Sequence, residues 1–410
     1  MEPPRRPRAA VLFGTGLSLF GALAAAAATT ALLPARVEEV ARAVERVRGR
    51  RFEKPVPASE IDGPELRRVL RTKVFEGFPS SPENTISTLV ALGFFEESPK
   101  LIDKLIDFYA SQVIAFYDPE PRRFFLVRGA AENLPEAEAA GELGGAMAEK
   151  MIFAHELTHA LQDESLRLDR RIKDLKENGD RALALESLLE GEATLVMVRV
   201  TLAELPGGES AEFEESLAPL LSAGALEKAN LPRDLPDYFA EQLFFPYVEG
   251  TAYVRRLVKA GGWAAIDRLW KAPPPSSSAI LHEKATFEPA EHLLSSSEEK
   301  SGPDGSRRLY SDTVGEWGVR FLLRKAIPKA EADALAAGWR GDRIAFFGAA
   351  GNVSYRWRIR FDGAASAERF ESAWRAGRKR NEQVSRTGSD VTILGGNGVP
   401  GNRVSGNRPS

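Results

Sequence analysis

Residues Ile152 to Leu161 read Ile-Phe-Ala-His-Glu-Leu-Thr-His-Ala-Leu, and the five central residues follow the pattern H-E-x-x-H. The residues around the motif are uncharged and include no proline, which predicts a buried helix. Because residues four apart share one face of a helix, His155 and His159 can reach a single metal ion. Glu156 lies about 100° further round the helix, where its carboxylate can face a water molecule at that ion. The pattern therefore predicts a zinc site with Glu156 as general base.

The counts of histidine and cysteine make this motif informative. The chain of 410 residues contains four histidines and no cysteine, which excludes disulfides, thiolate metal sites, cysteine nucleophiles and iron–sulfur clusters. At this composition, chance would place about 0.003 such pentads in the chain. Any metal ion in this protein must therefore be held by histidine and carboxylate side chains.

The charge balance argues against a nucleic-acid-binding protein. Lysine and arginine number 55 and aspartate and glutamate 58, so the formal net charge is −3. The chain therefore has no overall basic field that would attract a polyanion. Its hydrophobic content of 43% is sufficient for buried cores. We expect a globular protein that binds no nucleic acid.

The first 35 residues predict export from the cytoplasm. Three arginines among the first eight residues precede an uncharged, mostly apolar run of 25 residues from Ala9 to Leu33. This order is typical of a signal peptide or an N-terminal membrane anchor. Small residues near Ala28 favour cleavage, whereas the full run is also long enough to span a bilayer uncleaved. Either way, the rest of the chain is expected to be extracellular, periplasmic or membrane-anchored outside the cytoplasm.

The next part of the chain, residues 36–290, is predicted to be an α+β domain that is predominantly helical. Its first segment, 36–110, has apolar residues three and four apart and reads as helices. Two β-prone runs at 113–117 and 124–127 flank turn residues and predict a hairpin. Further helices are predicted at 141–167, 181–205, 213–226, 236–260 and 263–270.

A composition change separates this part from a second one. Proline, serine and glycine are frequent from 272 onward and predict loop, with a linker at 291–306. Beyond it we expect a small C-terminal α+β domain at 307–395 and a disordered tail at 396–410, where little can be buried. In this domain helices are predicted at 314–325, 330–337 and 365–376, and strands at 344–347 and 353–361.

A catalytic zinc ion usually takes three protein ligands and keeps a fourth position for water. The helix after the H-E-x-x-H helix carries three acids in an otherwise apolar stretch, namely Glu186, Glu190 and Glu192. Acidic residues in such surroundings need a partner, and a metal ion is one. The two remaining histidines, His282 and His292, are further candidates in the loop-like region.

These two segments together resemble the gluzincin metallopeptidases, in which the third zinc ligand is a glutamate on a helix downstream of H-E-x-x-H. Glu190-Gly-Glu-Ala193 is similar to the Glu-Gly-x-Ala ligand segment of several gluzincin families. The resemblance implies that Glu190 is the third ligand, with Glu192 and Glu186 as the alternatives. Glu186 shares a helix face with Glu190 and would support it from outside the ligand set.

The resemblance covers residues 151–164 and 185–197 and implies that the catalytic domain is zincin-like. Gly191 would allow the two helices to approach closely. One feature departs from the family, because many gluzincins have an aspartate four residues after the ligand glutamate to hold a zinc-bound histidine. Here that position is Thr194, and Asp163, four residues after His159, is the candidate to replace it.

The resemblance also implies the reaction, which is hydrolysis of an amide bond with Zn²⁺ as cofactor. Glu156 would take a proton from a zinc-activated water and pass it to the leaving amine. A further hydrogen-bond donor would stabilise the oxyanion, and the downstream candidates are Tyr247, Tyr253 and His282. The strand at 113–117 would bind an extended substrate by strand addition, as the edge strand of this family does.

We therefore expect an exported zinc-dependent metallopeptidase that acts on a protein or peptide substrate. Two other functions use the same residues: an inactive or structural zincin-fold scaffold, and a zinc amidohydrolase that acts on a non-peptide amide. The presence of Glu156 favours an active enzyme, because a decayed site commonly loses the residue that performs the chemistry.

Overall fold

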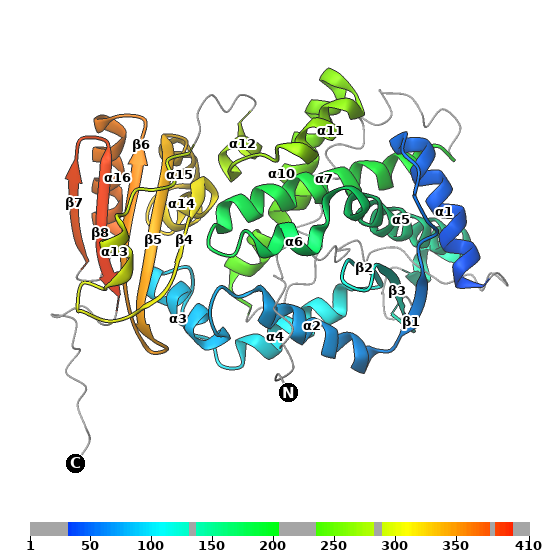
Figure 1. The fold of residues 1–410 in the computed structure, drawn as a ribbon, viewed down its shortest axis with the longest axis horizontal. Coiled ribbons are helices and arrows are strands. Elements are labelled where there is room, and N and C mark those ends of the chain that lie inside the picture. Colours follow the sequence, from blue (N-terminus) through cyan, green and yellow to red (C-terminus); the bar gives the residue numbers. More distant parts are fainter. Residues whose placement is uncertain (1–31, 131–136, 205–234, 283–288, 378–381, 397–410) are drawn as a thin grey trace, which may run out of the picture.

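The computed structural model describes residues 32–130, 137–204, 235–282, 289–377 and 382–396. Over these residues the chain is a predominantly helical α+β protein with two small sheets, as predicted (Figure 1). Among them, no helix has the length and apolar character needed to span a bilayer. The apolar run before residue 32, the helix predicted at 213–226 and the tail from 397 lie outside the described residues.

Four helices build the N-terminal part, and the sequence pattern predicted them. Ser81 caps the third by accepting a hydrogen bond from the amide of Asn84, with Pro82 in the first turn. The first helix begins at Leu33, inside the segment predicted as signal peptide or anchor. The helices are α1 (Leu33–Arg48), α2 (Gly63–Gly77), α3 (Pro82–Leu92) and α4 (Leu101–Gln112).

The predicted hairpin is confirmed and gains a third strand. Strand β2 (Ala115–Asp118) pairs antiparallel with β3 (Arg123–Val127), and Phe116 stands opposite Phe125. Strand β1 (Ala58–Ile61) pairs in parallel with the other edge of β3 and was not predicted. All four residues of β2 are buried, because this edge strand lies against the H-E-x-x-H helix.

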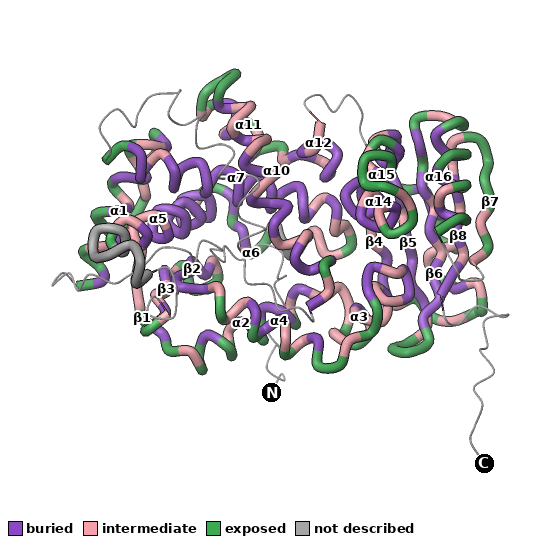
Figure 2. Tube along the Cα trace, turned by 180° about the vertical axis from the view of Figure 1, so that it is seen from behind, coloured by how far each residue is buried: buried purple, intermediate pink, exposed green. Residues whose placement is uncertain are grey.

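The long helix α7 occupies the centre of the helical part (Figure 2). It is buried along nearly its whole length by α5, α10, α1 and α14, so it shows no polar face. The predicted helices of this region are confirmed as α5 (Ala137–Leu166), α7 (Gly179–Leu202), α10 (Asp237–Gly261) and α11 (Trp263–Lys271). The helices α6 (Leu168–Lys173) and α12 (Ser277–Leu281) were not predicted, and α12 lies within the stretch predicted as loop.

Helices α7 and α10 are in contact at their backbones. A Cβ atom at Gly191 of α7 would lie 2.2 Å from the carbonyl oxygen of Gly250, and one at Gly250 would lie 2.2 Å from that of Ser187. Real atoms do not approach so closely, so both positions require glycine. The close approach predicted for Gly191 is therefore confirmed, and it brings side chains of α10 to the face of α7 that carries the acids.

The C-terminal part is a five-stranded antiparallel sheet in the order β4-β5-β6-β8-β7 with helices packed against it. The predicted helices and the strands β5 and β6 are confirmed, whereas β4, β7 and β8 were not predicted. The elements are α13 (Ser296–Lys300), β4 (Arg308–Asp312), α14 (Gly315–Arg324), α15 (Lys329–Ala336), β5 (Trp339–Ala349), β6 (Asn352–Phe361), α16 (Ala364–Gly377), β7 (Gln383–Thr387) and β8 (Asp390–Gly396).

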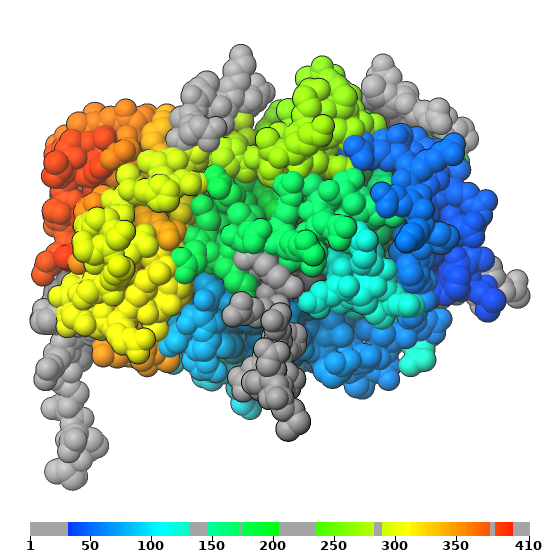
Figure 3. Space-filling view, viewed as in Figure 1, coloured from blue at the N-terminus to red at the C-terminus, as the bar shows by residue number. Residues whose placement is uncertain are grey.

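The two parts share one hydrophobic cluster. It joins Phe94, at the end of α3, and Tyr238 of α10 to Trp317 of α14 and Phe346 of the sheet. In the space-filling view, the yellow-to-red surface of the C-terminal part lies directly against the helical part (Figure 3). The segment predicted as linker, 291–306, contains α13, whose Glu298 pairs with Arg358 of β6. The boundaries of the two predicted domains stay a prediction.

A buried aspartate lies where the start of α7 meets α12 and α14. Asp180 is 3% exposed and accepts hydrogen bonds from the amide and the hydroxyl of Ser277. Gly315 lies so close that a Cβ atom there would overlap the Asp180 carboxylate. Burial, together with the nearby carboxylates of Asp342 and Glu316, raises the pKa of Asp180 to about 7, although the hydrogen bonds from Ser277 lower it.

Replacing Asp180 by asparagine should remove a pH-dependent part of the stability. The unfolded carboxyl ionises near 3.8 and the folded one near 7, so the folded state retains a proton that the unfolded state has lost. This stabilisation is complete below pH 3.8 and is lost as the pH rises through about 7. The free energy of unfolding of the wild type, relative to Asp180→Asn, should fall by about 3 kcal/mol between about pH 5 and 8. Urea denaturation at both pH values measures it, and a constant difference would contradict the burial of an ionisable Asp180.

Candidate metal centre

Three donor atoms from two helices converge in the core. The Nε2 atoms of His155 and His159 on α5 lie 3.1 Å apart, and Oε2 of Glu190 on α7 lies 3.0 Å from the first and 3.5 Å from the second. All three residues are buried. Among the described residues, they are the group whose side chains could together hold a metal ion. Among the three acids of α7, Glu190 is thus the one that meets both histidines.

The spacing of these atoms suits a small cation. Zinc binds histidine nitrogen and carboxylate oxygen at about 2.0 to 2.2 Å with tetrahedral geometry, which places ligand atoms about 3.3 Å apart. The observed separations of 3.0, 3.1 and 3.5 Å bracket that value. Two histidines and one carboxylate are also a ligand set known for catalytic zinc.

The pKa values of the three residues indicate a site that stabilises a positive charge. Burial lowers the pKa of His155, whereas at His159 the effect of burial is outweighed by the Glu190 carboxylate, which raises the pKa to about 9. Burial also opposes ionisation of Glu190, but the two histidines hold its pKa at about 2. A proton on His159 therefore balances the carboxylate in the metal-free chain, in the place where a metal ion would supply the charge.

Gln162 orients His159. Its amide nitrogen donates to the carbonyl of Leu189 and to Oε2 of Glu192, both at 3.0 Å, so its oxygen must face the imidazole. Nδ1 of His159 donates to that oxygen at 2.9 Å, which turns Nε2 of the same ring toward the other two donor atoms. From the sequence we expected Asp163 to orient a metal-binding histidine, and the role of Gln162 was not predicted. An amide inside an apolar helix, three residues after a ligand, was the available signal.

Glu192 holds this support in place and is not a ligand. It is fully buried and forms an ion pair with Arg48, the last residue of α1. Its Oε2 also accepts from Gln162 and, at 2.8 Å, from the indole of Trp270 on α11. Arg48 in turn pairs with Asp267 at 2.6 Å. Glu192, the alternative ligand considered from the sequence, is held by these contacts and lies outside the group formed by His155, His159 and Glu190.

Strand β2 is fastened to the H-E-x-x-H helix at two points, both through Tyr117. Its amide donates to Oε2 of Glu156 at 2.8 Å, and its hydroxyl donates to Oδ2 of Asp163 at 3.0 Å. Asp163 also accepts from Arg122 and from the amide of Leu168. Asp163 therefore anchors the hairpin and the end of α5, and not His159. Glu156 is fully buried and held in a fixed orientation beside the first metal-ligand candidate.

Of the three proposed oxyanion donors, the structure brings one to the centre. Tyr247 of α10 stacks on the ring of His155 with centroids 5.9 Å apart, and its hydroxyl hydrogen-bonds to Glu190. Burial and the neighbouring carboxylates raise the pKa of Tyr247 far above its usual value, so it remains a hydrogen-bond donor. Tyr253 packs beside Arg256, and His282 lies 2.9 Å from the carboxylate of Glu316. Both lie away from the three donor atoms.

Some polar atoms next to the centre have no partner among the described residues. Glu186 is 7% exposed, and burial and Glu190 raise its pKa well above the usual value. Its Oε1, Nδ1 of His155 and the hydroxyl of Thr194 accept or donate no hydrogen bond within the described part of the chain. The remaining histidine, His292, is exposed ahead of α13.

Comparison with known proteins adds one finding. A family model described as a domain of unknown function (DUF8575) matches residues 306–402, which include the C-terminal sheet and none of the residues of the metal centre. No curated protein and no solved structure matches the chain.

The ion pair of Arg48 and Glu192 should be essential to stability. Arg48→Met leaves a buried carboxylate without its cation, which should lower the free energy of unfolding by about 3 to 5 kcal/mol. The double variant Arg48→Met/Glu192→Gln should recover most of this loss, because no charge is then left unpaired. Chemical denaturation measures both variants. Arg42→Met, on the same helix with an exposed ion pair to Glu38, is the control and should change stability by less than about 1 kcal/mol. An equal loss in the single and double variants would contradict the assigned pairing.

Proposed function

We propose that this chain is a zinc-dependent metallopeptidase of the zincin-like kind, with His155, His159 and Glu190 as metal ligands. The observation that carries the proposal is the triangle of donor atoms, 3.0 to 3.5 Å on a side, with Glu156 beside it. The chain has no cysteine, and the donor set of two imidazoles and one carboxylate suits zinc. A zinc ion held there would supply a Lewis acid and lower the pKa of water at neutral pH.

Glu156 is proposed as the general base. Its position next to His155 places its carboxylate at the centre, and the amide of Tyr117 fixes one of its oxygens. A carboxylate held in this way can take a proton from the attacking water and transfer it to the leaving amine. Because Glu156 is buried, bulk water does not compete for hydrogen bonds to its carboxylate.

Tyr247 is proposed as the donor to the oxyanion of the tetrahedral intermediate. It approaches from α10, whereas the ligands come from α5 and α7, so it lies on another side of the centre. Its hydroxyl hydrogen-bonds to Glu190 in the free chain and would turn to the substrate oxygen as negative charge develops there. The backbone contact of α7 with α10 at Gly191 supports this assignment, because it fixes the distance of Tyr247 from the ligands.

The substrate is proposed to be a protein or peptide, and the apolar N-terminal segment supports an exported enzyme. The position of β2 at the edge of its sheet, beside the H-E-x-x-H helix, supports an extended substrate that pairs with this strand. A non-peptide amide would use the same ligands, so a substrate screen should include small amides as well as peptides.

Metal content should identify the ligands. The full chain should bind about one zinc ion, and Glu190→Gln should weaken zinc binding at least tenfold because it removes the anionic ligand. Elemental analysis and competition with a chelator measure this. Glu186→Gln is the matched control, one turn earlier on the same helix, and should retain the metal. A folded wild type without metal would refute the proposal, and loss of zinc in Glu186→Gln alone would reassign the third ligand.

Glu156 should be needed for turnover but not for zinc binding. Glu156→Gln keeps the size and the amide contact of the side chain but cannot accept a proton, so hydrolysis should fall at least about a hundredfold. The zinc content should remain that of the wild type. Cleavage of a peptide and amide library, read by mass spectrometry, measures the rate. Equal turnover in wild type and variant would exclude Glu156 as the base, and no turnover in either would favour a scaffold protein.

A further inference from the structure

A cavity of about 100 Å³ lies apart from the candidate metal centre, where α3, α7 and α10 meet the C-terminal part. Its walls include the aromatic side chains of Phe94, Tyr238, Tyr310, Trp317 and Phe346. These rings are buried and contact one another, as in the pair Tyr310 and Phe346 with centroids 5.0 Å apart. Aromatic faces carry partial negative charge and attract cations.

Two carboxylates line the same cavity. Asp180 is 3% exposed, and Asp312 is partly buried at the end of β4. Asp312 accepts hydrogen bonds from the amides of Gly179 and Thr313 through its Oδ1, each at 2.7 Å. Within the described residues its Oδ2 accepts none. The nearby cation Arg343 interacts with Asp312 only through its charge. Within the described part of the chain, the cavity therefore has a carboxylate oxygen that accepts no hydrogen bond.

A second unused acceptor lines the cavity from α3. Thr85 is 4% exposed, and its hydroxyl has no hydrogen-bond partner among the described residues. A buried hydroxyl without a partner is destabilising, and native proteins rarely keep one without a reason. Valine would fill the same space without this cost. The hydroxyl is thus a second, independent indication of a ligand.

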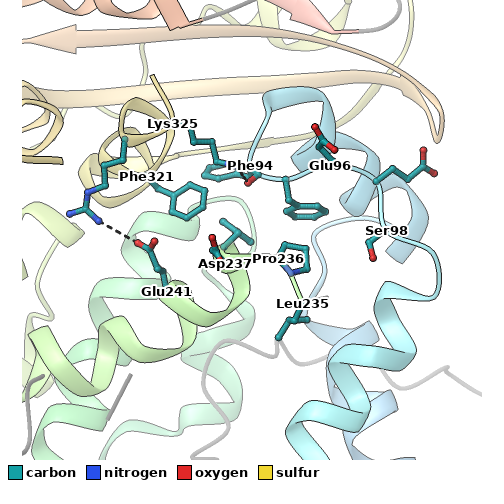
Figure 4. Close-up of a pocket in the computed structure, with 13 residues that line it drawn as sticks. Phe94, Glu96, Ser98, Leu235, Pro236, Asp237, Glu241, Phe321 and Lys325 are labelled. Atoms are coloured by element: carbon teal, nitrogen blue, oxygen red, sulfur yellow. Dashed lines mark hydrogen bonds and ion pairs between the residues drawn. The ribbon is translucent and has the colours of Figure 1, made fainter. Parts of the chain in front are cut away.

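An open pocket of about 520 Å³ adjoins this cavity and shares Phe94 and Tyr238 with it. Figure 4 shows Phe94 and Phe321 among acidic residues, with Asp237 and Glu241 on α10 and Glu96 on the facing loop. Four acids line the pocket: Glu96, Glu97, Asp237 and Glu241. The two cations in its lining are engaged, because Arg324 pairs with Glu241 and Asp333, and Lys325 donates to the carbonyl of Phe94. An acidic pocket of this kind concentrates cations.

We propose that the aromatic cavity binds a small protonated amine with an apolar body, which enters from the acidic pocket. The aromatic faces and the two carboxylates select positive charge. The unused acceptors on Asp312 and Thr85 select N–H donors, so a primary ammonium suits the cavity better than a quaternary one. The proposal does not depend on the metal centre.

The ionisation of the two acids agrees with this assignment. Burial raises the pKa of Asp180 to about 7 and that of Asp312 to about 6, because the hydrogen bonds to both carboxylates and the charge of Arg343 near Asp312 do not offset the cost of burial. Helix capping explains the contacts of Oδ1 of Asp312, which faces the first turn of α7. Capping does not explain the cavity, its aromatic walls or the unpaired hydroxyl of Thr85.

Calorimetric titration of the full chain at about pH 8 with benzylamine, benzyl alcohol and tetramethylammonium tests the proposal. Benzylamine should bind at least tenfold more tightly than either of the others, and Asp312→Asn should weaken it at least tenfold. Thr85→Val should also weaken the binding of benzylamine. It should leave the melting temperature of the free protein unchanged or raise it. This second variant keeps the test decisive if Asp312→Asn does not fold. Asp390→Asn on β8, paired with Arg360 outside the cavity, is the control and should bind as the wild type does.

Three results would overturn the proposal. Equal affinity for benzylamine and benzyl alcohol would show an apolar cavity without selection of charge. Tighter binding of tetramethylammonium than of benzylamine would show that the oxygens of Asp312 and Thr85 do not select N–H donors. No binding of benzylamine by the folded wild type would show that the cavity belongs to the packing of the core alone.

Discussion

The constraint on which the structure depends is the burial of three carboxylates on one helix. α7 is enclosed on all sides, and Glu186, Glu190 and Glu192 are buried with it. A buried carboxylate needs a cation or several hydrogen-bond donors. Each of the three carboxylates is stabilised in a different way. Glu192 has Arg48, Glu190 has two histidines and a tyrosine, and Glu186 is held with a raised pKa. The helices around α7 are placed so that they supply these partners.

The partners form a continuous set of contacts from the candidate metal centre to the surface of the helical part. His159 is held by Gln162, Gln162 by Glu192, and Glu192 by Arg48 and Trp270. Such a set fixes the imidazole more firmly than a single hydrogen bond would, because every member has its own second contact. On the other side, Tyr117 fastens β2 to Glu156. The candidate base and one candidate ligand are thus oriented by residues from four other parts of the chain.

Periodicity and spacing predicted the α+β class, most helices, the hairpin, and His155 and His159 together with Glu156, whereas Glu190 was implied by the resemblance to the gluzincins. These features are local, or follow from motifs on single helices. Strand β1 escaped prediction because its four residues, Ala58 to Ile61, lack alternation and are stabilised by pairing with β3. The same holds for β7 and β8, which gain order from β6. Gln162, Arg48 and Tyr117 could not be assigned because their roles depend on partners far away in the sequence. Sequence could likewise not choose among Tyr247, Tyr253 and His282, since the choice rests on where α10 crosses α7.

The distance along the chain between Arg48 and its partners affects how the protein is assembled. Glu192 follows Arg48 by 144 residues and Asp267 by 219. Closing loops of this length is slow compared with forming the helices themselves. During synthesis the H-E-x-x-H helix therefore exists well before its supporting contacts, and the centre is completed only when α11 has emerged and docked. While the chain is still being synthesised, His159 therefore lacks part of the set of contacts that orients it in the complete fold.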